Sequence, residues 1–235
     1  FRFYRRIARL TGYETGSTGG VEYVWNRQGS WPAYILGTPD WKGAVSILRA
    51  MERREAPAFW IMEDSPGFNL RKLEQKGGRV VRQWTGMSLE PSEFRFVPGS
   101  SDVEFRKDDP DDLQDWLHLV NTELMTGSQV GSEVLTAIGT SDAYRWIVAY
   151  RDGHAVGTGL SFTEEGITGL YMIVTERESR GKGVGSMITA ALIDNAIRNG
   201  ARGIVLHSTK LGEGLYRRLG FRPRNRFHIL WYLGI

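Results

Sequence analysis

The stretch RGKGVGS, residues 180–186, has the composition of a phosphate-binding loop. Its three glycines alternate with other residues, directly after an apolar run and directly before a helical pattern. Backbone N–H groups at the start of a helix have no intrahelical partner, and the helix dipole adds about half a positive charge there. Glycine lets a phosphate approach the backbone closely, and Arg180 and Lys182 add positive charge. The stretch therefore predicts a phosphate cradle, with a ligand-free strand-to-helix turn as the alternative.

Two nucleotide-binding motifs do not fit this stretch. A P-loop requires the pattern GxxxxGK[ST], which the sequence does not contain. A dinucleotide fingerprint requires GxGxxG, but after Gly183 and Gly185 the chain continues with Met187 and Ile188. The expected phosphate therefore belongs to another kind of ligand.

A second residue with useful chemistry lies 36 positions after Arg180, in the stretch GLYRRLGF. Tyr216 carries a phenol with an ordinary pKa near 10, and it can exchange a proton with a thiol of pKa near 8.5. The alternative is an aromatic side chain that only packs on a short helix. We expect no metal site, because the chain has no cysteine and its four histidines show no zinc-ligand spacing.

The elements that must position these residues follow a polar stretch at residues 97–102, which we interpret as a linker. An Asp109-Pro110 pair predicts the start of a helix, and Asp152-Gly153 predicts a hairpin turn. Asn199-Gly200 predicts the end of the helix that follows the glycine-rich stretch. The predicted order from residue 102 onward is β-α-α-β-β-β-α-β-α-β. The helix faces are predicted from periodic apolar residues, namely Leu113, Trp116, Leu117 and Val120 in the first helix and Val184, Ile188, Ala191 and Leu192 in the later one.

The first 95 residues contain a fainter copy of the same spacing. Ser65 to Gly77 spans 12 positions, as does Ser208 to Gly220, and each segment lies between two apolar strand-like runs. Counting back 24 positions from the serines reaches Trp41 and Val184, so we expect a helix to start near each of them. Where the second half has glycines, the first has LGTPDW. We therefore expect the N-terminal half to keep the scaffold and to lack the chemistry.

The composition of the chain limits the kinds of binding partner that we expect for the protein. A net charge of +3 is too small to indicate a nucleic-acid partner, although arginines gather in RRLGFRPRNRF. The acidic residues Asp108, Asp109, Asp111 and Asp112 are expected to stabilise the start of their helix through its dipole. No apolar run approaches the roughly 18 residues of a membrane span, and the N-terminus has no signal-peptide core. We therefore expect a cytoplasmic monomer or homodimer with no membrane partner.

The loop pattern RxxGxG together with LYRRLGF resembles the GNAT superfamily of N-acetyltransferases, and the element order from about residue 102 is similar as well. The resemblance implies a mixed α/β (α+β) fold with a mostly antiparallel sheet flanked by helices. It implies a catalytic GNAT domain at residues 99–235, preceded by a degenerate or partial GNAT-like domain at residues 1–98. It also implies acetyl-CoA as co-substrate and an amine as acceptor.

The resemblance implies a role for each motif residue. The backbone amides of Gly181, Lys182, Gly183, Val184, Gly185 and Ser186 would hold the pyrophosphate of acetyl-CoA, with Arg180 at the first motif position. The strand residues Ile173, Val174 and Thr175 would lie along the pantetheine arm and the thioester. Thr209 stands where the family often has asparagine, and Tyr216 would protonate the CoA thiolate.

The general base stays open at this stage. His207 lies on the next strand and has a suitable ordinary pKa near 6.5, whereas Glu123 and Glu133 belong to the first two helices, which rim the acceptor site in the family. A chain of water molecules could also serve. Two other functions stay open as well, a non-catalytic acyl-CoA sensor or assembly module and a transferase that uses aminoacyl-tRNA.

Overall fold

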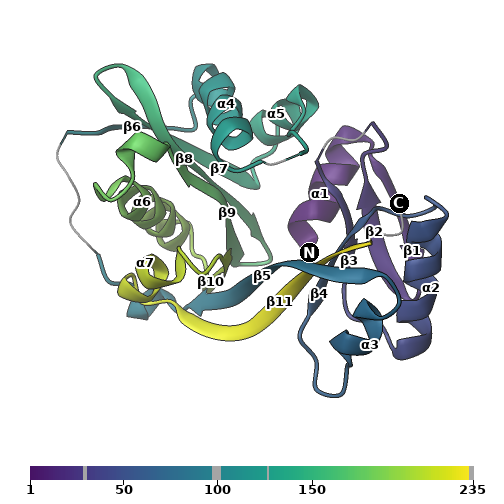
Figure 1. The fold of residues 1–235 in the computed structure, drawn as a ribbon. Coiled ribbons are helices and arrows are strands. Elements are labelled where there is room, and N and C mark those ends of the chain that lie inside the picture. The colour runs from purple at the N-terminus through teal and green to yellow at the C-terminus, as the bar shows by residue number, and fades with distance from the viewer. Residues whose placement is uncertain (29–30, 97–101, 126, 233–235) are drawn as a thin grey trace. The chain divides into compact units, whose positions relative to one another are not determined.

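The computed structural model describes residues 1–28, 31–96, 102–125 and 127–232. The chain forms two compact units. Unit 1 comprises residues 1–85 and 225–235, and unit 2 comprises residues 86–224 (Figure 1). The linker predicted at residues 97–102 lies, apart from Asp102, outside the described residues. These units differ from the predicted division at residue 98, because the last strand of the chain belongs to unit 1.

Unit 2 follows the predicted order of elements. Strand β5 (Gly78–Leu89) enters it and strand β11 (Arg222–Tyr232) leaves it. Between them lie η1 (Pro91–Glu93), β6 (Glu104–Lys107), η2 (Pro110–Asp112), α4 (Leu113–Glu123), α5 (Ser132–Gly139), β7 (Tyr144–Arg151), β8 (His154–Glu164), β9 (Ile167–Thr175), η3 (Arg177–Ser179), α6 (Val184–Arg198), β10 (Gly203–Ser208) and α7 (Glu213–Arg218).

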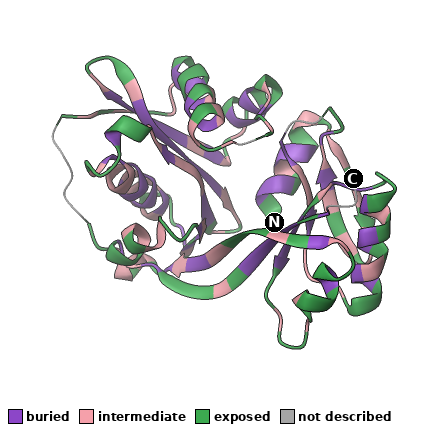
Figure 2. Cartoon of the chain, in the orientation of Figure 1, coloured by how far each residue is buried: buried purple, intermediate pink, exposed green. Residues whose placement is uncertain are grey.

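The sheet of unit 2 contains both antiparallel and parallel pairs of strands. Its strand order is β6-β7-β8-β9-β10-β5. Strands β6 to β9 pair antiparallel, and β9 pairs parallel with β10 across the α6 crossover. The hairpin predicted at Asp152-Gly153 is present, with both residues at positive φ, 51° and 76°. Figure 2 shows β7 and β8 buried over most of their length, because α6 covers one face of the sheet and α4 with α5 the other.

Helix α6 lies close to the sheet because β8 carries glycines beneath it. A Cβ at Gly159 would lie 2.8 Å from a side-chain carbon of Ile188, and one at Gly157 would lie 2.9 Å from another. Val184, Ile188 and Leu192 are buried on this face, as the periodicity predicts, and the fourth predicted residue, Ala191, is partly buried. In α4 the predicted residues Leu113, Trp116 and Val120 are buried, whereas Leu117 is only partly covered and Leu119 is buried in addition.

The acidic cluster before α4 does more than stabilise a helix start. Oδ1 of Asp108 accepts a hydrogen bond from the backbone N–H of Trp146 at 2.9 Å, and burial raises the pKa of Asp108. Oδ1 of the buried Asp112 accepts from the hydroxyl of Tyr150 at 2.7 Å. Asp109 is the N-cap of η2, where its Oδ1 accepts from the backbone N–H of Asp111 at 3.0 Å. Asp108 and Asp112 thus also bond to strand β7, and Asp112 is at the same time the N-cap residue of α4.

Unit 1 contains a second β-α-β arrangement. Its elements are α1 (Arg2–Thr11), β1 (Glu14–Thr18), β2 (Val21–Trp25), β3 (Ala33–Leu36), α2 (Trp41–Glu52), β4 (Phe59–Glu63), α3 (Leu70–Glu74) and parts of β5 and β11. Strands β1, β2 and β3 pair antiparallel, and β3 pairs parallel with β4 across α2. Unit 2 repeats this pattern with β7, β8, β9, α6 and β10. The two helices begin at Trp41 and Val184, which confirms the predicted spacing.

The last strand of each half belongs to the sheet of the other half. In unit 1 the strand beside β4 is β11, from the end of the chain, with Ile61 opposite Ile229. In unit 2 the strand beside β10 is β5, from the first half. Neither sheet is therefore complete without a strand from the other half of the sequence. No helix within the described ranges combines the length and the apolar character of a membrane span.

Candidate active site

The glycine-rich loop leads into α6 through two residues whose backbone conformation only glycine adopts readily. Gly181 has a φ of 75° and Gly183 a φ of 85°. Gly183 is the N-cap of α6, and within the described part of the chain no side chain caps this N-terminus. The first N–H groups of α6 have no intrahelical acceptor. The loop thus presents a helix start that can bind an anion.

Three parts of the predicted site meet at Gly185. A Cβ at this position would lie 3.2 Å from Oγ1 of Thr175, at the end of β9, and 3.6 Å from Cδ1 of Leu215 on α7. Gly185, the third glycine of the motif, does not have a positive φ. It instead lets Thr175 and Leu215 lie close to the backbone of α6. It brings together the end of β9, the start of α6 and the helix that carries Tyr216.

Strands β9 and β10 separate at the same end of the sheet. Their register runs from Ile167 opposite Gly203 to Leu170 opposite Leu206 and stops there. Just beyond, β9 contains a bulge against β8, marked by Met172 at a φ of 50°. Such a bulge leaves a residue out of the ladder and bends the strand. Ile173, Val174 and Thr175 therefore lie where β9 no longer pairs with β10.

Tyr216 is half-buried on α7, next to the loop that follows β10. Its ring packs edge to face on Phe221, with centroids 5.9 Å apart. Gly212 makes room for it, since a Cβ there would lie 2.9 Å from Cε2 of Tyr216. Burial raises the pKa of Tyr216 to about 12. Thr209 lies at the same corner, where its Oγ1 accepts from the backbone N–H of Gly212 at 3.3 Å and so supports the start of α7.

The family comparison identifies this arrangement. The acetyltransferase (GNAT) domain family matches residues 142–223, which contain the loop, the separated strands and α7. Residues 142–223 belong to the GNAT superfamily. None of the curated proteins matches the chain.

Solved structures extend the GNAT similarity to the fold of both units. A GCN5-related N-acetyltransferase from Kribbella flavida matches with a TM-score of 0.75 at 15% identity, over 100% of this chain and 95% of its own. A GCN5-related N-acetyltransferase from Sphaerobacter thermophilus matches with a TM-score of 0.68 at 19% identity, over 89% of this chain and 75% of its own. A tandem GNAT protein from the clavulanic acid biosynthesis pathway matches with a TM-score of 0.55 at 13% identity, over 91% of this chain and 80% of its own. The predicted GNAT fold is confirmed.

An ion pair connects the GNAT loop to α4. Nη2 of Arg180 lies 2.7 Å from Oε2 of Glu123, and Nε of Arg180 donates to the carbonyl oxygen of Thr175 at 3.0 Å. Glu123 is the last residue of α4, and its side chain is mostly covered. The sequence motif indicated Arg180 but gave no sign of this partner, because 57 residues separate the two in the chain.

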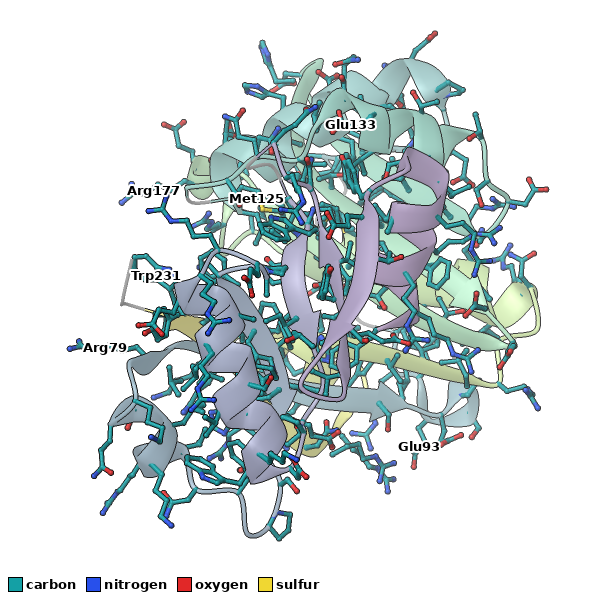
Figure 3. All side chains as sticks on the ribbon, turned by 90° about the vertical axis from the view of Figure 1, so that its right-hand side faces the viewer. Arg79, Glu93, Met125, Glu133, Arg177 and Trp231 are labelled. Atoms are coloured by element: carbon teal, nitrogen blue, oxygen red, sulfur yellow. The ribbon has the colours of Figure 1, made fainter. Side chains whose placement is uncertain are left out.

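The other two base candidates lie in different environments. His207 is the fifth residue of β10, just past the point where β9 separates, and burial lowers the pKa of His207 to about 4. Glu133 is exposed in the first turn of α5 (Figure 3). Its carboxylate folds back on its own helix start, since a Cβ at Gly131 would lie 2.3 Å from either of its oxygens. The described residues contain no group of three or more His, Cys, Asp or Glu that could hold a metal ion.

Sequence reasoning missed two features of the GNAT site. The bulge at Met172 has no signature in the apolar run ITGLYMIVT, because any strand of that composition could be regular. Gly212, which accommodates the Tyr216 ring, was visible in the sequence as a glycine four residues before Tyr216. That spacing places the two on one face of a helical turn.

Proposed function

We propose that this chain is an N-acyltransferase that transfers an acetyl group from acetyl-CoA to a primary amine of a small molecule or protein. The observation that carries the proposal is the uncapped start of α6, preceded by two glycines at positive φ, inside a matched GNAT domain. Such a helix start suits a diphosphate, because its N–H groups and the helix dipole both favour negative charge.

The proposed roles follow the positions of the residues. The backbone N–H groups from Gly181 to Ser186 would bind the pyrophosphate, and Lys182, exposed in the loop, would add charge. Ile173, Val174 and Thr175 lie beyond the last paired residues of β9 and β10, so their backbone is available to the pantetheine arm and the thioester. Thr209 would act through its contact with Gly212 rather than as a direct ligand.

The transfer needs a neutral amine, a polarised carbonyl and a proton for the leaving group. The amine nitrogen bonds to the carbonyl carbon, the carbon–sulfur bond breaks, the amine gives up one proton and the thiolate gains one. Deprotonating an amine with pKa near 10.4 at pH 7 costs about 4.6 kcal/mol. A backbone N–H near Ile173, beside the bulge, would donate to the carbonyl oxygen as negative charge develops on it.

Tyr216 is the proposed proton donor to the thiolate. Its pKa of about 12 keeps the phenol protonated at neutral pH, as a donor requires. Transfer from that phenol to a thiolate of ordinary pKa near 8.5 is unfavourable by about 4.8 kcal/mol. Burial raises the pKa of a thiol in the same way, so a thiolate bound beside Tyr216 narrows this gap.

Water is the favoured acceptor for the amine proton. Glu123 is paired with Arg180, and Glu133 folds against its own helix start. His207 is neutral at pH 7, but a pKa of about 4 makes it a weak base. A water chain through the opening between β9 and β10 is therefore preferred over all three side chains.

We propose further that unit 1 is a GNAT-like scaffold without an acetyl-CoA site. Its helix α2 corresponds to α6, but the N-cap is Asp40, whose Oδ1 accepts from the backbone N–H of Gly43 at 2.7 Å. The carboxylate of Asp40 therefore occupies, at the start of α2, the position that corresponds to the proposed pyrophosphate site of α6. Strands β3 and β4 also stay joined, since the N–H of Gly37 bonds to the carbonyl oxygen of Ile61 at 2.9 Å.

Two measurements test the proposal. Thermal unfolding with and without acetyl-CoA tests donor binding, because ligand at about 100 times its Kd adds about 2.7 kcal/mol to the free energy of unfolding. Release of free CoA thiol over a panel of primary amines then tests transfer. Thiol release that depends on both acetyl-CoA and an amine is the expected result.

The remaining outcomes separate the alternatives. Stabilisation by acetyl-CoA without thiol release for any amine would indicate an acyl-CoA sensor. The absence of any stabilisation at about millimolar acetyl-CoA would overturn both CoA-dependent functions. Aminoacyl-tRNA would then be the donor to test, with transfer of a labelled aminoacyl group as the measurement.

A further inference from the structure

Unit 1 contains a cavity of about 320 Å³ at the start of α2. It lies between residues 39–41 and the loop from β4 to α3, residues 65–69, with Lys72 at its side. Both segments match the acetyl-CoA segments proposed for unit 2, since Trp41 corresponds to Val184 and Ser65 to Ser208 in the repeated spacing. A cavity near 300 Å³ is at the small end of ligand sites and suits about 10–20 non-hydrogen atoms.

Two aromatic residues form the apolar wall of this cavity. Trp41 is the first residue of α2 and keeps 37% of its surface exposed, which is high for so large an apolar side chain. Its ring centroid lies 6.2 Å from that of Phe68. Phe68 in turn packs edge to face on Trp60, which is fully buried and donates from Nε1 to the carbonyl oxygen of Gly37 at 2.7 Å. Phe68 thus packs on a buried residue, while Trp41 keeps part of its ring exposed.

The polar groups of the cavity are unsuited to a phosphate and suit a molecule that carries one positive and one negative charge. Asp40 places a carboxylate at the helix N-terminus, and only one of its oxygens is needed for the bond to Gly43. Lys72 brings a cationic side chain to the same cavity. Its backbone N–H already bonds to Oδ1 of Asn69, which fixes the first turn of α3 beneath it. One anionic and one cationic group, joined by an aromatic wall, match a zwitterion with an aromatic ring.

We propose that the cavity of unit 1 binds an aromatic α-amino acid. Its ring stacks on Trp41, its ammonium group bonds to Asp40, and its carboxylate pairs with Lys72. Aromatic faces also attract a neighbouring ammonium group, which reinforces the contact of that end. The site is separate from the acetyl-CoA site and does not depend on the proposed transfer reaction.

Isothermal titration of the full chain with four compounds tests each contact. L-phenylalanine carries all three groups, phenethylamine lacks the carboxylate, 3-phenylpropionate lacks the ammonium group, and L-alanine lacks the ring. We expect L-phenylalanine to bind and each of the other three compounds to bind at least about 10-fold more weakly. Equal affinity for phenylalanine and either singly charged compound would overturn the zwitterion assignment. No heat with phenylalanine up to about 10 mM would overturn the site.

Three variants locate the binding. Asp40→Asn removes the charge but keeps the helix cap, because Asn caps as well as Asp. Trp41→Ala removes the ring, and Lys72→Met removes the cation. Each should weaken phenylalanine binding about 10-fold or more, with acetyl-CoA binding unchanged. The matched control is Trp231→Ala, which removes another exposed tryptophan of unit 1, 39% exposed (Figure 3), and should leave phenylalanine binding intact.

Two results would overturn the location. Full binding in both Asp40→Asn and Trp41→Ala would place the amino acid elsewhere. Loss of acetyl-CoA stabilisation in Trp41→Ala, with a folded circular-dichroism spectrum, would mean that the cavity serves acetyl-CoA instead.

Discussion

Arg180 and Glu123 join the glycine-rich loop to the end of α4, with Nη2 of Arg180 at 2.7 Å from Oε2 of Glu123. The pair places a carboxylate beside a loop that we propose to bind a pyrophosphate. The guanidinium of Arg180 also donates from Nε to the carbonyl oxygen of Thr175, so two of its nitrogens are already bonded within the protein. The state of this ion pair should therefore control how tightly the loop binds its ligand.

Glu123→Gln should tighten acetyl-CoA binding about 3- to 10-fold, because it removes a negative charge near the pyrophosphate and frees Arg180. Arg180→Gln should weaken binding by a similar factor. Titration calorimetry at two salt concentrations measures both, and the difference between the variants should shrink at high salt. Glu133→Gln on α5 serves as the control and should bind like the unchanged protein. Weaker binding in Glu123→Gln would mean that Glu123 instead positions Arg180 for the ligand.

Gly181→Ala should reduce acetyl-CoA affinity about 10-fold or more. Gly181 has a φ of 75° with no atom within 4 Å of an added Cβ, so the methyl group would occupy the space that a phosphate needs. Gly200→Ala is a matched control, with a φ of 78° and equally open surroundings at the end of α6. Both should lose about 1–2 kcal/mol of stability from backbone strain. If both variants bind acetyl-CoA equally well, the loop does not hold the phosphates.

Tyr216→Phe should lower kcat for acetyl transfer by about 10- to 1,000-fold and change the KM for acetyl-CoA little. The ring and its contact with Phe221 are kept, so the thermal midpoint with and without acetyl-CoA should be unchanged. Steady-state thiol release measures the rates. An unaltered kcat would assign the proton to water or to another side chain.

His207 should make the protein lose stability in mild acid. Burial lowers its pKa to about 4, so between pH 6.5 and pH 4 the unfolded chain binds a proton at this residue and the folded chain does not. The free energy of unfolding should therefore fall by about 3 kcal/mol over that range as the pH is lowered. His207→Gln should remove this part of the loss.

Urea unfolding at several pH values measures the effect of His207. His154→Gln, at the exposed first residue of β8, is the control for replacing a histidine by glutamine. A loss of stability that is the same with and without His207 would mean that its pKa is not lowered. An inflection of kcat/KM near pH 6.5 that disappears in His207→Gln would restore His207 as the general base.

Local pattern was enough to predict the order of elements from residue 102 onward and the start of α2 in the first half. Asp152-Gly153 determines a hairpin, Asn199-Gly200 ends α6, and the equal spacing of Trp41 and Val184 from Ser65 and Ser208 predicted two equivalent helix starts. These signals work because turns, caps and amphipathic faces depend on residues close together in the chain. The glycine alternation also indicated where a phosphate could approach the backbone, because positive φ is a local property.

Only the tertiary structure decided what depends on residues far apart in the chain. Three features have no local signature in the sequence. They are the separation of β9 from β10 after Leu170, the ion pair of Arg180 with Glu123, and the exchange of β5 and β11 between the sheets. The burial of His207 and Tyr216 likewise depends on which strands and helices surround them. A strand adds equally well to any free edge of matching register, and a charge pairs with any opposite charge in reach. The sequence determined which residues could bind and react, and the fold decided which of them meet.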